Sequence, residues 1–353
     1  MSQGKQTHSS GCNLRHRLMK EKDMNQETVR KPGITGLLKK NGSGRRIPAI
    51  YFSLGMLVVF LLVFSLGNPS FFKKYNLLTI GTSASILLAV GLGQVCTILT
   101  GGIDLSVGGI MSLVSVFFMF TVEKLGYMAF PLALLIGVAA GMVNGLLNAS
   151  LKIPSFITTL GTGGIFVSLA YMISAKPLSA PSSAYGLLDL VNGSVLGIKN
   201  IMIIGLCIFL VFFVIQKYTL IGRGIFFIGS NEKMSWLSGL DVFKIRVAAF
   251  TLAGLGAGAA GLMLASTLFS GYPTMGNVYV LNSIATVVVG GTAMTGGAGG
   301  VFNTLVGALI MSVLNNGMNV VGIDVYSQQT ILGILIIFAV AISFDRSKLT
   351  VIK

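Results

Sequence analysis

Long apolar stretches, separated by short polar or glycine-containing segments, recur along the chain from about residue 49. They cover residues 49–67, 78–98, 105–121, 128–148, 154–174, 201–217, 246–268, 279–293, 301–320 and 328–344. Most have about 17 to 24 residues, the length that a helix needs to cross the hydrocarbon of a bilayer. The pattern therefore predicts an all-α, polytopic membrane protein of about ten transmembrane helices.

Glycines interrupt this pattern in two places, 78–121 and 279–320. In each place, one broken helix is as compatible with the sequence as two separate helices. The span boundaries in these two regions are therefore left open.

Composition supports the membrane class. Hydrophobic residues make up 53% of the chain, charged residues 10%, and the mean hydropathy is +0.85. Soluble domains contain about 25% charged residues, so this chain lacks the polar coat that a soluble core of its size would need.

Basic residues are distributed unequally between alternate loops. Twenty of the 25 Lys and Arg lie before the first span, after the fourth and sixth spans, or after the last span, and five lie in the other loops. Because cytoplasmic loops are enriched in Lys and Arg, we expect both termini and the 218–244 loop to be cytoplasmic and 175–200 to face outside. The net charge of +15 therefore reflects membrane topology, and no nucleic-acid partner is predicted.

The chain divides into three parts on this basis. Residues 1–47 are polar and basic and lack the apolar core of a secretory signal, so we expect a disordered cytoplasmic tail. Residues 48–346 form the transmembrane domain, and 347–353 form a short cytoplasmic C-terminal tail.

Residues for catalysis or metal binding are missing from the predicted spans. Both histidines lie in the N-terminal tail, the three cysteines are far apart, and no spacing typical of metal ligands occurs. No P-loop pattern occurs either, so the chain has no motif of this kind for holding ATP. We predict a transport subunit without its own ATPase site, metal or cofactor.

A carboxylate and a hydroxyl follow a glycine pair in Gly101–Ser106, between two apolar stretches. An acidic residue near bilayer depth is costly unless it faces protein or water, and irregular backbone is tolerated there only under the same condition. We therefore predict that Asp104 accepts hydrogen bonds that order this turn at a gate. The alternative is a simple N-cap of the following helix.

Amide side chains also lie within the apolar stretches. Asn315 and Asn319 share one helix face, and Asn144 and Asn148 repeat the same spacing. Hydrogen bonding between helices is one interpretation; a path for an uncharged, hydroxyl-rich solute is the other. The predicted translocation pathway comprises Gln94, Thr100, Asp104, Ser106, Asn315, Asn316 and Asn319.

The longest predicted cytoplasmic loop contains the signals of a short helix. Ser230 or Asn231 can cap its N-terminus and Gly239 can end it. Met234 and Leu237 place apolar side chains on one face. This pattern is typical of a docking element; the alternative is a helix lying in the lipid interface.

Glycine spacing in the spans predicts close helix packing. Gly137, Gly141 and Gly145 form a ridge of small residues. The sequence GAGAAG at 256–261 also matches the dinucleotide pattern G-x-G-x-x-G, but it lies inside an apolar stretch with no acidic residue about 20 positions later. We therefore interpret it as a packing motif.

Five motifs together resemble the ribose-type ABC sugar-transporter permeases of the branched-chain amino acid/ribose permease superfamily. They are TGGIDLSVG at 100–108, KIPSFITTLG at 152–161, GSNE to LSG at 229–239, VVGGT at 288–292 and LNNGMN at 314–319. They occur in the family's order, and the resemblance covers roughly residues 50–346.

The resemblance implies a bacterial inner-membrane permease that forms a homodimer or heterodimer. Such a permease receives solute from an extracytoplasmic sugar-binding protein and is driven by a separate cytoplasmic ABC ATPase. The implied ATPase-coupling residues are Asn231, Glu232, Met234, Leu237, Ser238 and Gly239. The family tends to have small residues where this chain has Lys233 and Met234, which predicts a different ATPase groove.

We therefore expect the permease of an importer for a pentose or a similar small sugar. The alternatives are an ABC permease for an amino acid or nucleoside, or a secondary transporter or channel. Proton coupling is disfavoured, because proton relays use chains of intramembrane ionisable residues that are scarce here.

Overall fold

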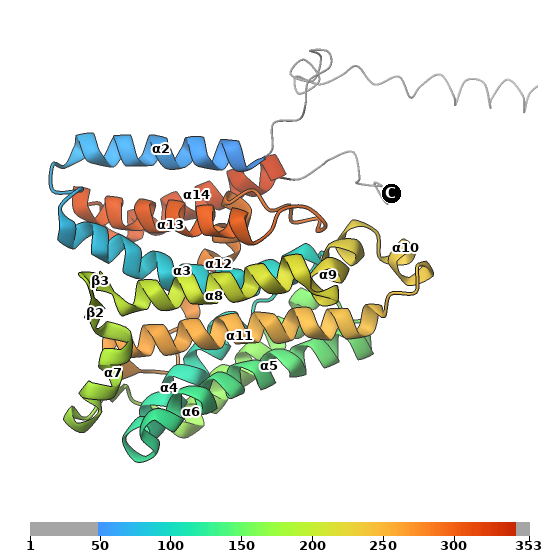
Figure 1. Cartoon of the computed structure of the whole chain (residues 1–353), viewed down its shortest axis with the longest axis horizontal. Helices are drawn as coiled ribbons and strands as arrows, with labels where there is room; N and C mark the ends of the chain where they lie inside the picture. The colour runs from blue at the N-terminus through green and yellow to red at the C-terminus, as the bar shows by residue number, and fades with distance from the viewer. Residues whose placement is uncertain (1–48, 344–353) are drawn as a thin grey trace, which may run out of the picture. The chain divides into compact units, whose positions relative to one another are not determined.

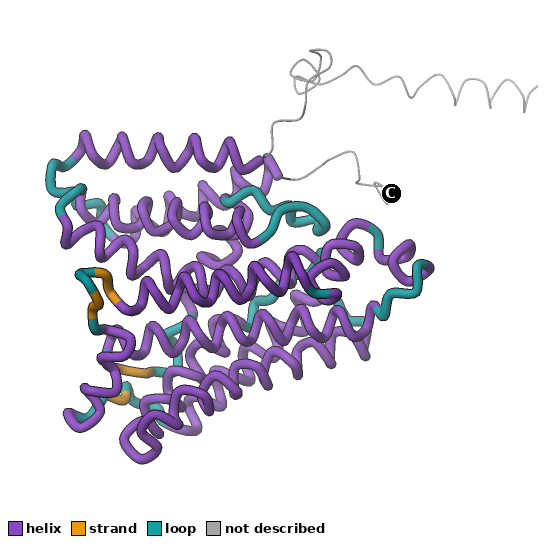
Figure 2. The backbone as a smooth tube through the Cα atoms, viewed as in Figure 1, coloured by secondary structure: helices purple, strands orange, loops and turns teal. Residues whose placement is uncertain are grey.

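The computed structural model describes residues 49–343, so the predicted tails 1–47 and 347–353 lie outside the described residues. The described chain is mainly helical (Figure 1, Figure 2). One helix occupies each of the ten predicted apolar stretches. These helices are α2 (Ala49–Gly67), α3 (Lys74–Leu99), α4 (Val107–Leu125), α5 (Ala129–Leu151), α6 (Ser155–Ile173), α8 (Asn200–Tyr218), α11 (Val242–Leu268), α12 (Asn277–Val289), α13 (Val301–Val321) and α14 (Val325–Ser343).

Seven apolar helical segments among residues 49–343 are long enough to cross a membrane. One of them, Val107–Leu151, comprises α4 and α5 joined by a 3₁₀ turn. Helix α12 has only 13 residues, fewer than a full crossing requires. The all-α, polytopic class is confirmed, while ten complete crossings stay a prediction.

Short elements connect the long helices. The helical ones are η2 (Gly126–Met128), η3 (Ser182–Ala184), α7 (Tyr185–Asn192), α9 (Leu220–Ser230) and α10 (Glu232–Leu237). Strand β1 (Leu178–Ser179) pairs antiparallel with β4 (Ser270–Gly271), and β2 (Ser194–Val195) pairs antiparallel with β3 (Ile198–Lys199).

The two glycine-rich interruptions are loops between separate helices. Residues 100–106 separate α3 from α4, and residues 290–300 separate α12 from α13. Gly101 has φ +82°, Gly296 φ +82° and Gly297 φ +72°. These left-handed conformations favour glycine, which explains why glycines lie at the two breaks.

Helix α11 packs against α3, α4 and α5, and glycines bring these backbones into direct contact. A Cβ atom at Gly137 of α5 would lie 2.8 Å from the Gly254 carbonyl oxygen and 2.8 Å from the Gly258 Cα of α11. Real Cβ atoms do not approach backbone so closely, so the predicted glycine ridge allows this pair of helices to meet.

The 256–261 motif packs helices, as predicted. A Cβ atom at Gly256 would lie 2.6 Å from the Ala89 carbonyl oxygen of α3, and one at Gly261 would lie 2.7 Å from the Met111 carbonyl oxygen of α4. The glycine between them faces α5. The three glycines thus contact three different helices.

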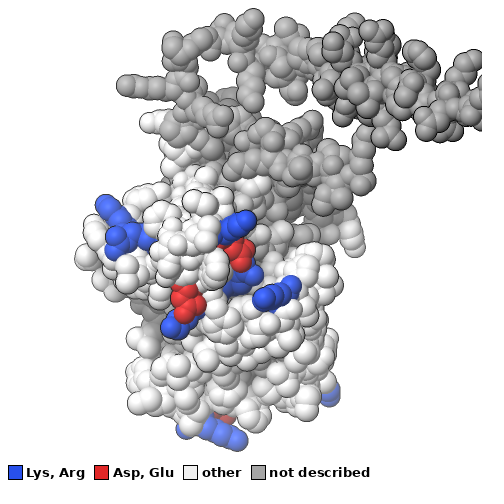
Figure 3. Space-filling model, turned by 90° about the vertical axis from the view of Figure 1, so that its right-hand side faces the viewer, with Lys and Arg blue, Asp and Glu red and all other residues white. Residues whose placement is uncertain are grey.

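The loops predicted inside and outside lie at opposite ends of the described helices (Figure 1). The start of α2, the end of α14 and helix α10 share one end, and α7 with the β2–β3 hairpin lies at the other. Figure 3 looks onto the end that carries α10 and shows several basic and acidic side chains gathered there.

Cysteine labelling tests the predicted orientation. In a background with Cys12, Cys96 and Cys207 replaced by serine, we expect Ser182→Cys to react with a membrane-impermeant maleimide on intact cells. Ser230→Cys should react only after permeabilisation, because the charge distribution places it inside. Both serines are exposed, so accessibility does not limit either reaction. Labelling of Ser230→Cys on intact cells would contradict the predicted topology.

Candidate functional site

The loop between α3 and α4 is anchored by hydroxyl side chains of α6. The backbone N–H of Ile103 donates to Ser155 Oγ (2.9 Å), and the N–H of Leu105 donates to Thr159 Oγ1 (2.9 Å). Buried backbone groups outside helices and sheets need such partners. The loop therefore has a defined conformation that depends on a distant part of the sequence.

Asp104 is fully buried, and its carboxylate organises the approach to α4. Oδ1 accepts hydrogen bonds from the Ser106 N–H (2.8 Å) and Oγ (2.6 Å). The Asn144 amide of α5 donates to the same Ser106 Oγ (2.6 Å). With its amide oriented to match its neighbours, Gln94 of α3 donates to the Asp104 carbonyl oxygen (3.1 Å) and accepts from the Asp104 N–H (3.3 Å). We call these four residues the Asp104 cluster.

The two predicted roles of Asp104, hydrogen-bonded turn and helix cap, can be compared with this geometry. Its bond to the N–H two residues ahead forms an Asx turn just before Val107, where α4 begins. Asp104 Oδ2 and Asn144 Oδ1 are buried without a hydrogen-bond partner among the described residues. Ser106 occupies the N-cap position of α4, and no side chain among the described residues accepts a hydrogen bond from the first turn of this helix. Asp104 therefore orders the turn before α4 and is not its N-cap.

Four glycines bring the two helix breaks together at the end of α9. The Gly297 N–H donates to the Leu99 carbonyl oxygen (3.0 Å). A Cβ atom at Gly296 would lie 2.8 Å from the Gly101 nitrogen and 3.0 Å from the Gly229 Cα. We call Gly101, Gly229, Gly296 and Gly297 the glycine junction. A Cβ atom at Gly229, Gly296 or Gly297 would collide with the backbone of a neighbouring segment, and Gly101 has the left-handed φ that favours glycine.

Helix α10 lies next to this junction and has the predicted caps. Asn231 Oδ1 accepts from the Met234 N–H (3.0 Å), and Gly239, with φ +83°, follows the helix end. Ser230 is the last residue of α9, so Asn231 is the N-cap. A single residue therefore separates α10 from α9, which ends at the glycine junction.

Three large apolar side chains of α10 are exposed beside its charged residues Glu232 and Lys233. Met234 is 57% exposed and Leu237 60% exposed, and Trp236 is also exposed. Ser238 Oγ donates to the Met234 carbonyl oxygen (2.9 Å) and closes the last turn. The helix thus presents large apolar side chains at the end of the molecule where charged residues gather.

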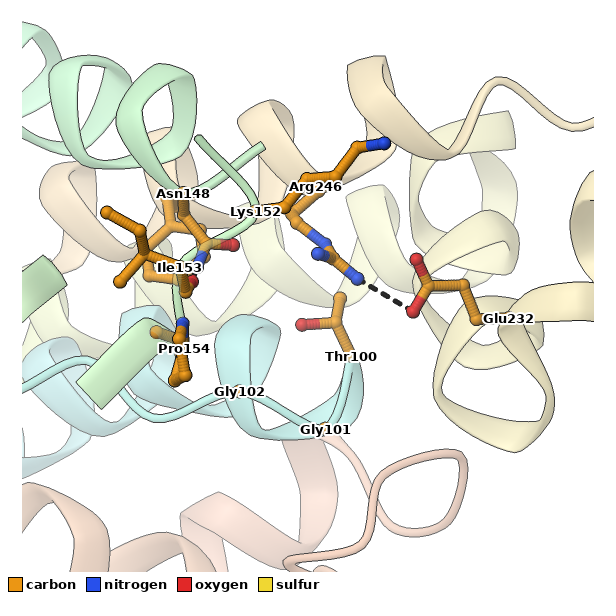
Figure 4. A pocket seen from close by; sticks show the side chains of 11 residues that line it. Thr100, Gly101, Gly102, Asn148, Lys152, Ile153, Pro154, Glu232 and Arg246 are labelled. Atoms are coloured by element: carbon orange, nitrogen blue, oxygen red, sulfur yellow. Dashed lines mark hydrogen bonds and ion pairs between the residues drawn. The ribbon is translucent and has the colours of Figure 1, made fainter. Parts of the chain in front are cut away.

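An ion pair links the first residue of α10 to α11. Arg246 Nη2 lies 2.8 Å from Glu232 Oε2, and the Arg246 side chain is only 22% exposed (Figure 4). At the start of α11, the Lys244 N–H donates to Asp241 Oδ1 (3.1 Å). This backbone hydrogen bond holds the pKa of the Asp241 carboxyl below its usual range.

The ion pair borders a polar pocket of about 270 Å³. Figure 4 shows Thr100 and the glycine pair on one wall and the α5–α6 turn on another. The pocket is lined by Thr100, Gly101, Gly102, Asn148, Lys152, Ile153, Pro154, Ser155, Glu232, Arg246 and Phe250. The α3–α4 loop, the α5–α6 turn, α10 and α11 therefore meet around one space.

The predicted pathway residues of α13 lie outside the Asp104 cluster. Asn315 lines a separate cavity of about 340 Å³. Asn319 Oδ1 accepts from Gln328 Nε2 of α14 (2.7 Å), and Asn316 Oδ1 is buried without a partner among the described residues. The structure thus brings Gln94, Asp104 and Ser106 together but does not bring the three asparagines to them.

Several residues of these sites were not predicted from sequence. In the sequence, Arg246 is recognisable only as a basic residue near the end of a predicted cytoplasmic loop. Asn144 is recognisable only by its spacing of four from Asn148. Tyr279 and Asn282, three residues apart in α12, line the cavity with Asn315. Their only signal in the sequence is that two side chains with polar ends lie three residues apart in an apolar stretch.

Substitution of Asp104 separates hydrogen bonding from charge. Asp104→Ala removes the buried acceptor of two Ser106 donors, which should cost about 1–3 kcal/mol and lower the thermal midpoint of the purified protein in detergent. Asp104→Asn keeps the Oδ1 acceptor and should stay close to the wild-type midpoint. Asp324→Ala is the matched control: it removes an exposed cap of α14, so its effect on the thermal midpoint should be smaller than that of Asp104→Ala. An unchanged midpoint in Asp104→Ala would contradict the structural role of the cluster.

Comparisons with known proteins identify the family. The model for the permease component of branched-chain amino acid transport systems matches residues 76–340. The ribose import permease of Bacillus subtilis is 38% identical over 298 residues, which cover 84% of this chain and 92% of that protein. The D-allose transport system permease of Escherichia coli is 33% identical over 309 residues, which cover 84% and 92%.

The fructose import permease of Rhizobium meliloti is 32% identical over 300 residues, covering 81% of this chain and 83% of that protein. No solved structure matches the chain significantly. The family model and the relatives each span most of the transmembrane domain that contains the Asp104 cluster, the glycine junction and α10. The chain therefore belongs to the permease family of the branched-chain amino acid transport type, as its resemblance to ribose-type permeases implied.

Proposed function

We propose that this chain is the permease subunit of a binding-protein-dependent ABC importer for a ribose-like pentose or a similar small sugar. The observation that carries the proposal is the match, over more than four-fifths of the chain, to permeases for ribose, D-allose and fructose. All three solutes are small, uncharged and rich in hydroxyl groups. The bacterial inner membrane is the location that the apolar helices and these relatives support.

The proposed assembly contains a cytoplasmic ATPase, an extracytoplasmic sugar-binding protein and a second permease copy. An ATPase subunit is the proposed source of energy, because the relatives include import permeases for sugars. The ATPase consumes the ATP, and this chain supplies the membrane path. Whether the second copy is identical is left open.

Helix α10 is the proposed coupling element. Its exposed Met234 and Leu237 provide an apolar contact for the ATPase, and Asn231, Ser238 and Gly239 fix the ends of the helix. A force on α10 has two routes into the protein. One is the ion pair to α11, and the other is the glycine junction at the end of α9.

The translocation path is proposed to involve both helix breaks. The Asp104 cluster acts as the gate element, because Gln94 of α3 and Asn144 of α5 hold the α3–α4 loop by hydrogen bonds, and Thr159 of α6 adds a further one. The polar pocket with Thr100 lies on the α10 side of this loop. The asparagines of α13 belong to a second segment of the path, which includes the cavity at Asn315.

Reconstitution distinguishes this function from its alternatives. The permease is placed in proteoliposomes with its cognate ATPase and binding protein, and radiolabelled pentoses, hexoses, nucleosides and amino acids are offered. We expect uptake of a pentose or another small sugar only when ATP and both partners are present. Uptake by the permease alone would support a channel or secondary transporter, and selective amino-acid or nucleoside uptake would support another ABC permease.

Leu237→Asp tests whether α10 docks the ATPase. An unpaired charge in a dry apolar contact costs several kcal/mol, so sugar-stimulated ATP hydrolysis of the assembled complex should collapse. Membrane insertion should be normal, because no apolar stretch is changed. Leu237→Met, which keeps an apolar side chain, is the control. Normal association and coupled hydrolysis in Leu237→Asp would remove α10 as the coupling element.

Charge exchange tests the ion pair between α10 and α11. Glu232→Arg or Arg246→Glu alone places two like charges together and should lower sugar uptake per ATP hydrolysed. The double variant restores opposite charges and should recover part of the ratio. The pair is partly solvent-exposed, so the expected coupling is below that of a buried pair. Additive losses in the double variant would show that the pair has no role in transmission.

A further inference from the structure

A second cavity lies at the end of α11 opposite to α10. It has a volume of about 340 Å³ and is open on one side. Its polar lining comes from Ser83 of α3, Tyr272 of the loop after α11, Tyr279 and Asn282 of α12, and Asn315 of α13. Small-molecule sites start at about 300 Å³, so one monosaccharide has room here.

The polar side chains of this cavity are free to bind a ligand. Asn282 is only 9% exposed, yet its amide makes no hydrogen bond to another described residue. The same is true of the Asn315 amide, the Ser83 hydroxyl and the two tyrosine hydroxyls. By contrast, Asn148 donates to a carbonyl oxygen of the α5–α6 turn (2.8 Å). Asn282 is buried and the other four residues are half-buried. The donors and acceptors of all five side chains are therefore not used within the described residues and can hydrogen-bond to a polar ligand in this cavity.

The remaining lining is apolar and uncharged. It consists of leucine, methionine and valine side chains and the two tyrosine rings, and no Asp, Glu, Lys or Arg of the described residues lines the cavity. A monosaccharide matches this surface, because it has hydroxyl groups at its edge and C–H groups on its faces. A zwitterionic amino acid does not match, because its two charges would be buried without partners.

We propose that this cavity is a transient binding site for one monosaccharide within the permease itself. Asn282, Asn315 and Tyr279 contact sugar hydroxyls, and the aliphatic wall contacts the sugar faces. The site rests on the proposed sugar-import function and adds to it a second point of sugar selection. Selectivity is then shared between the binding protein and this chain.

Paired sugars test the proposal without changing the other subunits. Complete transporters in proteoliposomes receive binding protein preloaded with D-ribose or with 2-deoxy-D-ribose, and uptake per ATP hydrolysed is measured for each sugar. Asn282→Leu, Asn315→Leu and Tyr279→Phe each remove hydrogen-bonding capacity while keeping side-chain size. We expect D-ribose uptake per ATP to fall about fivefold for each lost hydrogen bond.

The ratio between the two sugars gives the specific readout. At least one variant should lose the wild-type difference in uptake between ribose and its deoxy analogue. The substituted side chain no longer hydrogen-bonds to the 2-hydroxyl group, which is the group in which the two sugars differ. Tyr75→Phe is the matched control: Tyr75 is on α3 and 82% exposed, outside the cavity. Thermal midpoint and ATPase association identify any variant that fails to fold.

Two outcomes separate the hypotheses. In the first outcome, the wild-type complex imports sugar and all three cavity variants match Tyr75→Phe in both uptake and sugar ratio. This result overturns the cavity site and leaves the proposed function intact. Absence of sugar import by the wild-type complex overturns the proposed function itself.

Discussion

Direct backbone contact along α11 is the interaction on which the other features of the structure depend. Helices in lipid gain little from hydrophobic burial against each other, so they rely on dispersion contacts between closely approaching backbones. Glycines on three sides of α11 allow such contacts with α3, α4 and α5. A methyl group at Gly256 or Gly261 would meet a carbonyl oxygen of the adjacent helix, which leaves no room for adjustment by side-chain rotation.

This packing gives α11 a fixed position between the two proposed sites, α10 and the second cavity. Its first turns carry Arg246, paired with Glu232 of α10, and its last turns carry Leu264 and Leu268, which line the second cavity. The Asp104 cluster is built from α3, α5 and the loop between α3 and α4. Densely packed interiors do not deform continuously, so the proposed transmission from α10 would take the form of movements of whole helices.

Local sequence signals predicted much of the fold. Hydrophobic stretches located ten helices, glycine pairs located both helix breaks, and the Asn231 and Gly239 caps located α10. These features depend on neighbouring residues and on helical periodicity, so one sequence is sufficient. The shortness of α12 was the main surprise in the helices, because its apolar stretch continues into the loop that follows.

The partners of the site residues could not be predicted in the same way. Ser155 and Thr159 hold a loop about 50 residues away, and Glu232 meets Arg246 only because α10 folds back onto α11. The predicted pathway residues also belong to two separate places in the structure. Asn315 lines the second cavity, whereas Asp104 lies in the cluster with Asn144. Such contacts are set by helix packing, which leaves no periodic signal in a single sequence.

Amide hydrogen exchange, measured by mass spectrometry on the complete transporter, tests most directly whether α10 communicates with both helix breaks. Exchange is compared between the nucleotide-free complex and the complex with a non-hydrolysable ATP analogue. Transmission through the glycine junction predicts that residues 100–106 and 290–300 change their exchange rates together with 231–239. If exchange changes only in 231–239 of an active complex, and not in 100–106 or 290–300, α10 does not communicate with the two helix breaks.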